Sequence, residues 1–275
     1  MYDKIVLTDF CHTIVNYPTC DNFVRYVKRK VGVNTWSMAF NEGLRIILQK
    51  TRLIRLLDHI YPKVMTNKVL FLRQLKGIKE DVIKQLGREY YDAYMKPNLI
   101  QEVVQYLKEL NADGYKIFVI SSAYDTYLRY LVDDLPIEGI LCTEMKYKDG
   151  KFTGRYKDMD CFGNEKYLRA KKFFKTESLK DIDSIGLSDE LADYPMLDMC
   201  RKSIIVKEAG SEPQKWIKEK GYEMLEFWPD GGVRLWINSF FTNIFQTIQN
   251  LNHLFCFPKE QLYCFSNGSL VGGDE

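Results

Sequence analysis

The sequence predicts an α/β protein built on a doubly wound, mostly parallel sheet with an inserted helical segment. A short β-branched strand at 4–10 opens the chain, and from about residue 97 short apolar runs alternate with helical patterns. Residues 18–96 instead place apolar side chains at three- and four-residue spacing, which is typical of amphipathic helices. Alternating strands and helices favour a parallel sheet. We therefore assign 1–17 and 97–208 to an α/β core and 18–96 to a helical cap.

The predicted elements follow in order along the core. The strand "KIVLTDF" is short and bounded by polar residues, and it delivers Asp9 to its carboxyl end. After a helix at 99–110, the strand "YKIFVIS" ends at Ser121, and a later strand, "DIDSIGLSD", ends at Asp189. The remaining elements are helices at 125–135 and 165–174, strands at 139–145 and 202–208, and a hairpin at 147–156 with turn residues Asp149 and Gly150.

Three of these strand ends carry polar side chains: Asp9, Ser121 and Asp189. Ligands of such sheets bind at the carboxyl ends of the strands. Asp193 follows the third strand, and Lys166 precedes it. Carboxylates suit Mg²⁺, whereas lysine and hydroxyl groups stabilise phosphate charge. The set points to phosphoryl transfer, in which Asp9 attacks phosphorus and water hydrolyses the resulting aspartyl phosphate.

Four short motifs occur in a fixed order between residues 3 and 208. The first reads D-F-C-H-T at 9–13. The others are "FVISSA" with Ser121, "CFGNEKYL" with Lys166, and "SDELADYPML" with Asp189 and Asp193. In this order they resemble the haloacid dehalogenase superfamily of phosphatases, in particular its phosphoserine-phosphatase-like branch, whose first motif is D-x-D-x-T. The hairpin and the start of the cap, "PTCDNFVRYV", are similar to that branch as well.

The resemblance implies a magnesium-dependent hydrolase of a small phosphorylated substrate. Asp9 would be the nucleophile, and Ser121 with Lys166 would hold the transferring phosphoryl group. Thr13 and Ser122 would contribute to substrate binding. The cap would cover the site and select the substrate. Bacterial relatives with a cysteine in the first motif resemble members of surface-polysaccharide gene clusters, so a sugar phosphate is one expected substrate.

The resemblance also implies the ligands of the metal. Mg²⁺ would be bound by the carboxylates of Asp9 and Asp189 and by the backbone carbonyl of Cys11, and Asp193 would support it directly or through water. A carbonyl is available from every residue type. The cysteine therefore leaves the expected metal site intact.

Cys11 departs from the family pattern, because the branch has an aspartate there that protonates the leaving oxygen and then activates water. A free thiol has a pKa of about 8.5, against about 3.9 for aspartate, so the thiolate base is scarce at neutral pH. Lost acid–base help costs about 10²–10⁴-fold. His12 should face away if strand geometry continues. A cap carboxylate or the substrate could serve instead, or the leaving group needs no proton. The alternative function is a catalytically impaired phosphate-binding, metal-binding or regulatory protein.

Each candidate also has a purely structural interpretation. Asp9 can cap a turn, and the hydroxyl of Ser121 or Ser122 can bond local backbone. The acidic pair can decorate a helix N-terminus, where the macrodipole favours it. Cys11 can be an inert filler, or a reactive nucleophile if a lysine activates it. The order of the four motifs favours the catalytic interpretation.

Composition excludes several classes of protein. The 275 residues carry a net charge of +2, which gives no nucleic-acid footprint. Hydrophobic residues make up 46% and charged residues 28%, as in a folded globular chain. Seven cysteines without C-x-x-C spacing predict free thiols rather than a zinc ribbon or a disulfide framework. With no signal-peptide pattern at the N-terminus, we expect a cytoplasmic protein.

Residues 209–275 form a predicted extension. Between Arg234 and Lys259 there is no Asp, Glu, Lys or Arg. An apolar stripe at steps of three and four consists of Ile237, Phe241, Ile244, Ile248, Leu251 and Phe255. Interspersed Asn and Gln make it a poor bilayer-spanning segment. A helix docked on the body, a homodimer seam and a peripheral membrane-binding helix remain open.

Overall fold

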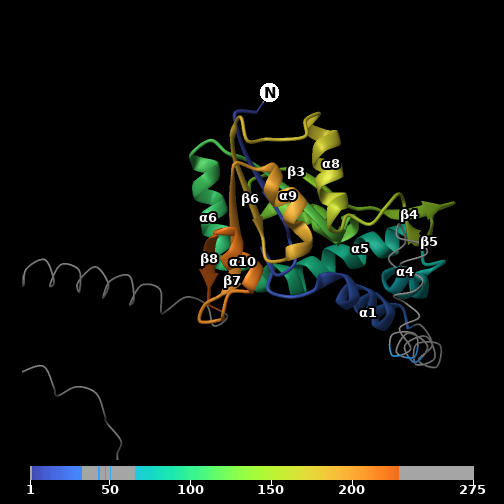
Figure 1. The fold of residues 1–275 in the computed structure, drawn as a ribbon. Coiled ribbons are helices and arrows are strands. Elements are labelled where there is room, and N and C mark those ends of the chain that lie inside the picture. The colour runs from blue at the N-terminus through green and yellow to red at the C-terminus, as the bar shows by residue number, and fades with distance from the viewer. Residues whose placement is uncertain (1, 33–42, 44–46, 48–49, 51–65, 229–275) are drawn as a thin grey trace, which may run out of the picture. The chain divides into compact units, whose positions relative to one another are not determined.

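The computed structural model describes residues 2–32, 43, 47, 50 and 66–228. In these residues a six-stranded parallel sheet has the strand order β3-β2-β1-β6-β7-β8 (Figure 1). The strands are β1 (Lys4–Thr8), β2 (Lys116–Tyr124), β3 (Ile137–Thr143), β6 (Asp183–Ser188), β7 (Lys202–Glu208) and β8 (Glu223–Phe227). The predicted doubly wound parallel sheet is confirmed.

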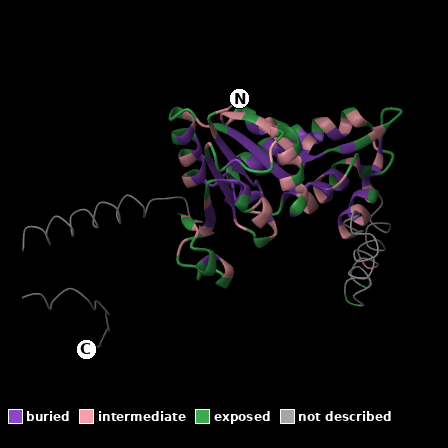
Figure 2. Cartoon of the chain, turned by 45° about the horizontal axis from the view of Figure 1, so that its top comes forward, coloured by how far each residue is buried: buried purple, intermediate pink, exposed green. Residues whose placement is uncertain are grey.

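Helices cover both faces of the sheet, because successive residues of each buried strand point to opposite sides. On one face Val6 belongs to the same apolar cluster as Val103 and Leu107 of α6 (Gln101–Ala112). On the other face Ile5 and Leu7 cluster with residues of α8 (Asn164–Phe174) and α9 (Tyr194–Met199). Figure 2 shows the sheet as the buried layer between these helices.

The segment predicted to be the cap, residues 18–96 and called the cap below, follows β1 and leads back to the core before α6. Its described helices are α1 (Thr19–Val31), α4 (Thr66–Leu72), η1 (Arg73–Leu75), α5 (Glu80–Tyr90), the π-helical turn η2 (Tyr91–Met95) and η3 (Lys96–Asn98). The other described helices are α7 (Asp125–Leu128), η4 (Arg129–Asp133), η5 (Leu191–Asp193) and α10 (Lys215–Lys220). The helical character predicted for the cap holds in these segments.

The predicted hairpin forms as β4 (Met145–Lys148) and β5 (Lys151–Tyr156), but it joins the cap rather than the central sheet (Figure 1). Phe152 N–H donates to the carbonyl of Ile78, and Gly77 N–H donates to the carbonyl of Phe152, both at 2.9 Å. Glu80 N–H donates to the carbonyl of Gly150. Backbone hydrogen bonds thus join the β4–β5 hairpin, which belongs to the core part of the chain, to the residues at the start of α5.

Strand register brings the polar strand ends to one level. Thr8, the last residue of β1, pairs with Val119 of β2 and with Leu187 of β6. The next residue, Asp9, therefore follows a central strand whose two neighbours lead into Ser121 and Asp189. Topology alone places the three candidate side chains at one edge of the sheet.

The sheet continues past residue 208, the predicted end of the core, so this boundary is too early. Strand β8 pairs in parallel with β7, and α10 lies between them in the chain. The residues from 229 onward, including the apolar stripe, lie outside the described residues. Within the described part, no helix has both the length and the apolar character needed to cross a bilayer.

Cysteine usage agrees with the sequence prediction where the structure describes it. The five described cysteines are free thiols: Cys11, Cys20, Cys142, Cys161 and Cys200. Three of them are buried and the other two are partly buried. They behave as small apolar side chains rather than as a disulfide framework.

Gly87 of α5 is expected to be essential for seating the cap. A Cβ built at this position would clash with the carbonyl oxygen of Thr126, which is backbone and has little room to move. Gly87→Ala should lower the free energy of unfolding by about 1–3 kcal/mol through overpacking. Urea denaturation measures the change. The matched control is Gly43→Ala, because a Cβ there meets no described residue within 4 Å. Equal effects of the two substitutions would contradict the close contact.

Candidate active site

Asp9 lies directly beyond β1, and its backbone N–H still donates to Leu187 of β6 at 2.9 Å. The chain then turns tightly, since the N–H groups of Ile14 and Val15 both donate to the carbonyl of Phe10. His12 adopts a left-handed backbone with φ 57° and is exposed. Strand alternation therefore ends before His12, and the expectation based on a continued strand does not apply to it.

Lys166 connects the two carboxylates nearest to it. It lies in the first turn of α8, is 2% exposed, and places Nζ 2.6 Å from Asp9 Oδ1 and 2.6 Å from Asp193 Oδ2. Burial alone would lower the pKa of Lys166, but the charges of Asp9 and Asp193 outweigh it and raise this pKa above its ordinary value. The lysine is a fixed cation between two acids.

Asp193 is fully buried in η5, and its Oδ2 also accepts a hydrogen bond from the Ser188 hydroxyl at 2.6 Å. Its other oxygen, Oδ1, is buried and has no hydrogen-bond partner among the described residues. Burial, and next the charge of Asp9, outweigh the attraction of Lys166 and raise the pKa of Asp193 above its ordinary value. Ser188 was not predicted from the sequence, although it directly precedes Asp189 at the same strand end.

Asp189 directly follows β6 and lies near Asp9. Thr13 is fully buried, and its hydroxyl donates to Asp189 Oδ1 at 3.0 Å. Thr13 thus orients an acidic side chain from the turn after Asp9. Burial, and next the negative charge of Asp9, raise the pKa of Asp189 to about 7. Two carboxylates that repel each other in a buried site favour a nearby cation.

The residues present fit a hard cation. Among the described residues, no three Asp, Glu, His or Cys side chains form a complete ligand cluster. The expected donor set needs only two carboxylates, Asp9 and Asp189, and the carbonyl of Cys11. Oxygen donors of this kind suit Mg²⁺, which keeps several waters and binds few protein carboxylates. The unpartnered Oδ1 of Asp193 fits a supporting role through water.

The end of β2 carries the predicted phosphate-binding hydroxyls. Ser121 is fully buried, and its Oγ accepts a hydrogen bond from Ala123 N–H at 3.3 Å. Ser122 and Ala123 form a bulge, because the pairing with β3 shifts between Ser121 and Tyr124. Such bulges re-aim side chains next to functional sites. The structure therefore places both serines at the edge that holds Asp9.

Cys11 is partly buried, and its Sγ lies 3.2 Å from Thr19 Oγ1, which in turn lies 2.8 Å from the hydroxyl of Tyr127. Burial, and next the charges of Cys20 and Asp9, raise the pKa of the Cys11 thiol to about 12. The side chain is therefore a neutral thiol at pH 7. This environment was not predictable from the sequence, since it depends on how the cap packs.

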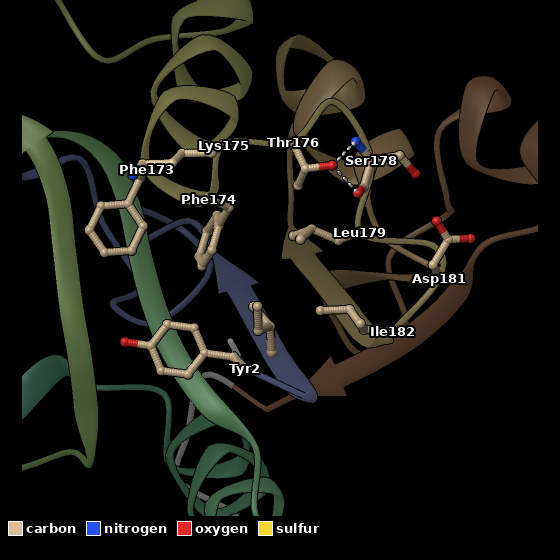
Figure 3. A pocket seen from close by; sticks show the side chains of 10 residues that line it. Tyr2, Phe173, Phe174, Lys175, Thr176, Ser178, Leu179, Asp181 and Ile182 are labelled. Carbon is tan, nitrogen blue, oxygen red and sulfur yellow. Dashed lines mark hydrogen bonds between the residues drawn. The ribbon is translucent and has the colours of Figure 1, made fainter.

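A separate pocket of about 500 Å³ lies away from these residues (Figure 3). Three aromatic rings line it, from Tyr2, Phe173 and Phe174, together with Leu179 and Ile182. Tyr2 precedes β1 and Ile182 precedes β6, so the pocket is at the amino ends of the strands. No predicted site residue lines it, which separates it from the group around Asp9.

A family model described as haloacid dehalogenase-like hydrolase matches residues 6–198. The phosphoserine phosphatase of Methanocaldococcus jannaschii is 24% identical over 214 residues, which cover 75% of this chain and 90% of that protein. The phosphoserine phosphatase of Archaeoglobus fulgidus is 21% identical over 127 residues, 46% of this chain. This second match spans only 35% of that protein's length.

Solved structures share the fold. A Bordetella pertussis protein of unknown function has a TM-score of 0.66 at 16% identity, over 82% of this chain and 99% of that chain. A substrate-bound phosphoserine phosphatase has a TM-score of 0.53 at 19% identity, over 82% of this chain and 93% of that chain.

The family model matches more than half of the chain, and the matched residues include all four sequence motifs. The predicted resemblance to the phosphoserine-phosphatase-like branch is confirmed. The chain belongs to the family of haloacid dehalogenase-like hydrolases.

Proposed function

We propose that this protein is a magnesium-dependent phosphatase that hydrolyses a small phosphomonoester through an aspartyl phosphate on Asp9. The observation that carries the proposal is the contact of buried Lys166 with both Asp9 and Asp193 at the carboxyl end of a parallel sheet. The names of its relatives, both phosphoserine phosphatases, support a phosphate ester as substrate. A sugar phosphate of surface-polysaccharide synthesis is a narrower candidate to include among test substrates.

The residues divide the chemistry between them. Lys166 holds Oδ1 of Asp9, so Oδ2 is the candidate nucleophile. Its attack forms the O–P bond as the ester P–O bond breaks, and the alkoxide takes a proton from solvent and leaves as the alcohol. Water then attacks phosphorus and gives up a proton to solvent, the bond between phosphorus and Asp9 breaks, and phosphate and the free carboxylate are released. Ser121, Ser122 and Lys166 stabilise the charge on the transferring group.

The carboxylates of Asp9 and Asp189 and the carbonyl of Cys11 would hold Mg²⁺. When bound, the ion neutralises charge on the phosphoryl oxygens and on these acids. Ser188 and Lys166 both donate to Oδ2 of Asp193 and so fix the orientation of this carboxylate. Thr13 does the same for Asp189.

A second candidate function is phosphate and metal binding with little turnover. The observation that favours it is the Cys11 thiol, whose pKa of about 12 makes it a poor acid and leaves almost no thiolate base at pH 7. If the protein is a phosphatase, a thiol that is such a poor acid should make the release of leaving groups that need a proton slow. Activated esters such as aryl phosphates should then be the better substrates.

Asp9→Asn is expected to lower hydrolysis of an aryl phosphate in the presence of Mg²⁺ by about 10⁴-fold or more, because the nucleophile is lost. The matched control is Asp158→Asn, an exposed acid outside the site, which should retain full activity. Steady-state release of the aryl alcohol gives kcat and KM. An unchanged rate for Asp9→Asn would remove the proposed chemistry.

Cys11→Asp is expected to raise kcat by about 10²–10⁴-fold, because a carboxylate at this position can supply general acid and base help. Cys11→Asn serves as the control, since it removes the thiol without adding an acid. Comparison of an aryl phosphate with an alkyl phosphate shows whether the gain is larger for the poorer leaving group. A loss of activity in Cys11→Asp would mean that the thiol has a role of its own.

Removal of divalent cations is expected to abolish hydrolysis and to lower the thermal midpoint. Mg²⁺ at about 100 times its dissociation constant should raise the midpoint by roughly 5–10 °C, because it relieves the repulsion between Asp9 and Asp189. Differential scanning fluorimetry measures this shift without relying on activity. Asp189→Asn should lose most of the shift, whereas Asp158→Asn should keep it. Retention of the full shift in Asp189→Asn would place the ion elsewhere.

A further inference from the structure

Lys68 is a cap residue whose charged end lies inside the core. It belongs to α4, is 9% exposed, and its Nζ forms an ion pair with Asp160. The same Nζ donates to the backbone carbonyl of Ser122 at 2.5 Å and lies 4.9 Å from the ring centre of Tyr124. A lysine is rarely buried unless it is paired. The contacts of Lys68 are therefore specific ones, made across the boundary between cap and core.

The carbonyl of Ser122 belongs to the bulge that follows Ser121. A second cap group, the thiol of Cys20 in α1, also donates to it at 3.4 Å. Two cap helices thus contact the peptide group next to the predicted phosphate-binding hydroxyls. A shift of this peptide would move the side chains and N–H groups that face the phosphoryl oxygens, and small misplacements of such groups are costly in catalysis.

Asp160, the partner of Lys68, connects this lysine to the end of β3 and to the loop before Lys166. Its Oδ1 accepts from the hydroxyl of Thr143 at 2.6 Å, and Thr143 Oγ1 accepts from Cys161 N–H at 2.9 Å. Thr143 ends β3, and Cys161 lies in the loop that leads into α8 and Lys166. Asp160 Oδ2 is buried without a hydrogen-bond partner among the described residues. The carboxylate thus depends on Lys68 for its charge compensation.

We propose that Lys68 is a positioning residue, which couples the seating of the cap to the geometry of the phosphoryl-binding strand end. The inference rests on the proposed function. Lys68 aligns Ser122 through its backbone carbonyl, and it aligns the loop before Lys166 through Asp160. With the cap displaced, Asp160 is left as an unpaired buried acid and the Ser122 carbonyl loses its charged donor. The site is therefore complete only when α4 is in place.

The test compares Lys68→Met, Lys68→Arg, Asp160→Asn and the double variant Lys68→Met/Asp160→Asn. Inorganic phosphate binding in the presence of Mg²⁺ is measured by calorimetry, aryl phosphate hydrolysis gives kcat and KM, and the thermal midpoint reports stability. Lys84→Met is the matched control, because Lys84 is a cap lysine in an exposed pair with Glu80. It should change none of these quantities.

Lys68→Met is expected to weaken phosphate binding by about tenfold or more and to lower kcat, together with the thermal midpoint. The double variant removes both buried charges, so it should recover most of the midpoint. Its phosphate affinity and kcat should stay low, because the donor to Ser122 is still missing. Lys68→Arg, which keeps the charge, should recover part of the affinity.

Two outcomes would overturn the positioning role. One is wild-type phosphate affinity in Lys68→Met, and the other is recovery of affinity and kcat along with stability in the double variant, which would reduce Lys68 to a counterion for Asp160. A wild-type protein that binds no phosphate would contradict the proposed function itself, and this result is distinct from either of the two.

Discussion

The buried contact of Lys166 with Asp9 and Asp193 is the interaction on which the site depends. It joins the end of β1, the first turn of α8 and η5 through one ammonium group. Charges of this kind are stable in a protein interior only when they are paired and hydrogen-bonded. The sheet must therefore hold β1 and β6 in register, and α8 must begin where it does, for the site to exist.

The sequence predicted this group because of the geometry of parallel sheets. Each of Asp9, Ser121 and Asp189 ends an apolar run, and parallel strands bring their carboxyl ends to one edge whatever the length of chain between them. The position of β1 between β2 and β6 comes from the structure alone, because the sequence predicted these strands but not their order in the sheet. Lys166 needed the motif, because a lysine on a helix is otherwise indistinguishable from a solvated charge.

Other features depend on packing that one sequence pattern does not encode. Strand β8 reads "EMLEF", and of its residues only Phe227 is buried, so its alternation is too weak to distinguish an edge strand from a loop. Lys68 has one signal in hindsight, since it shares a helix face with Phe71 and Leu72, which are buried. Asp160 has none, because its partners come from the cap and from β3.

The cysteine at position 11 changes the charge balance of the site as well as its acid–base chemistry. Asp9 and Asp193 already contact Lys166, and Asp189 is a third acid close enough to feel the charge of Asp9. Burial, and next the charge of Asp9, raise the pKa of both Asp189 and Asp193. A fourth carboxylate would add repulsion that the resting site must bear, whereas the Cys11 thiol remains neutral. Active sites often sacrifice stability for function. In the proposed phosphatase, the neutral thiol avoids this repulsion but supplies no acid, so the reaction would depend on leaving groups that need no proton or on an acid from the cap.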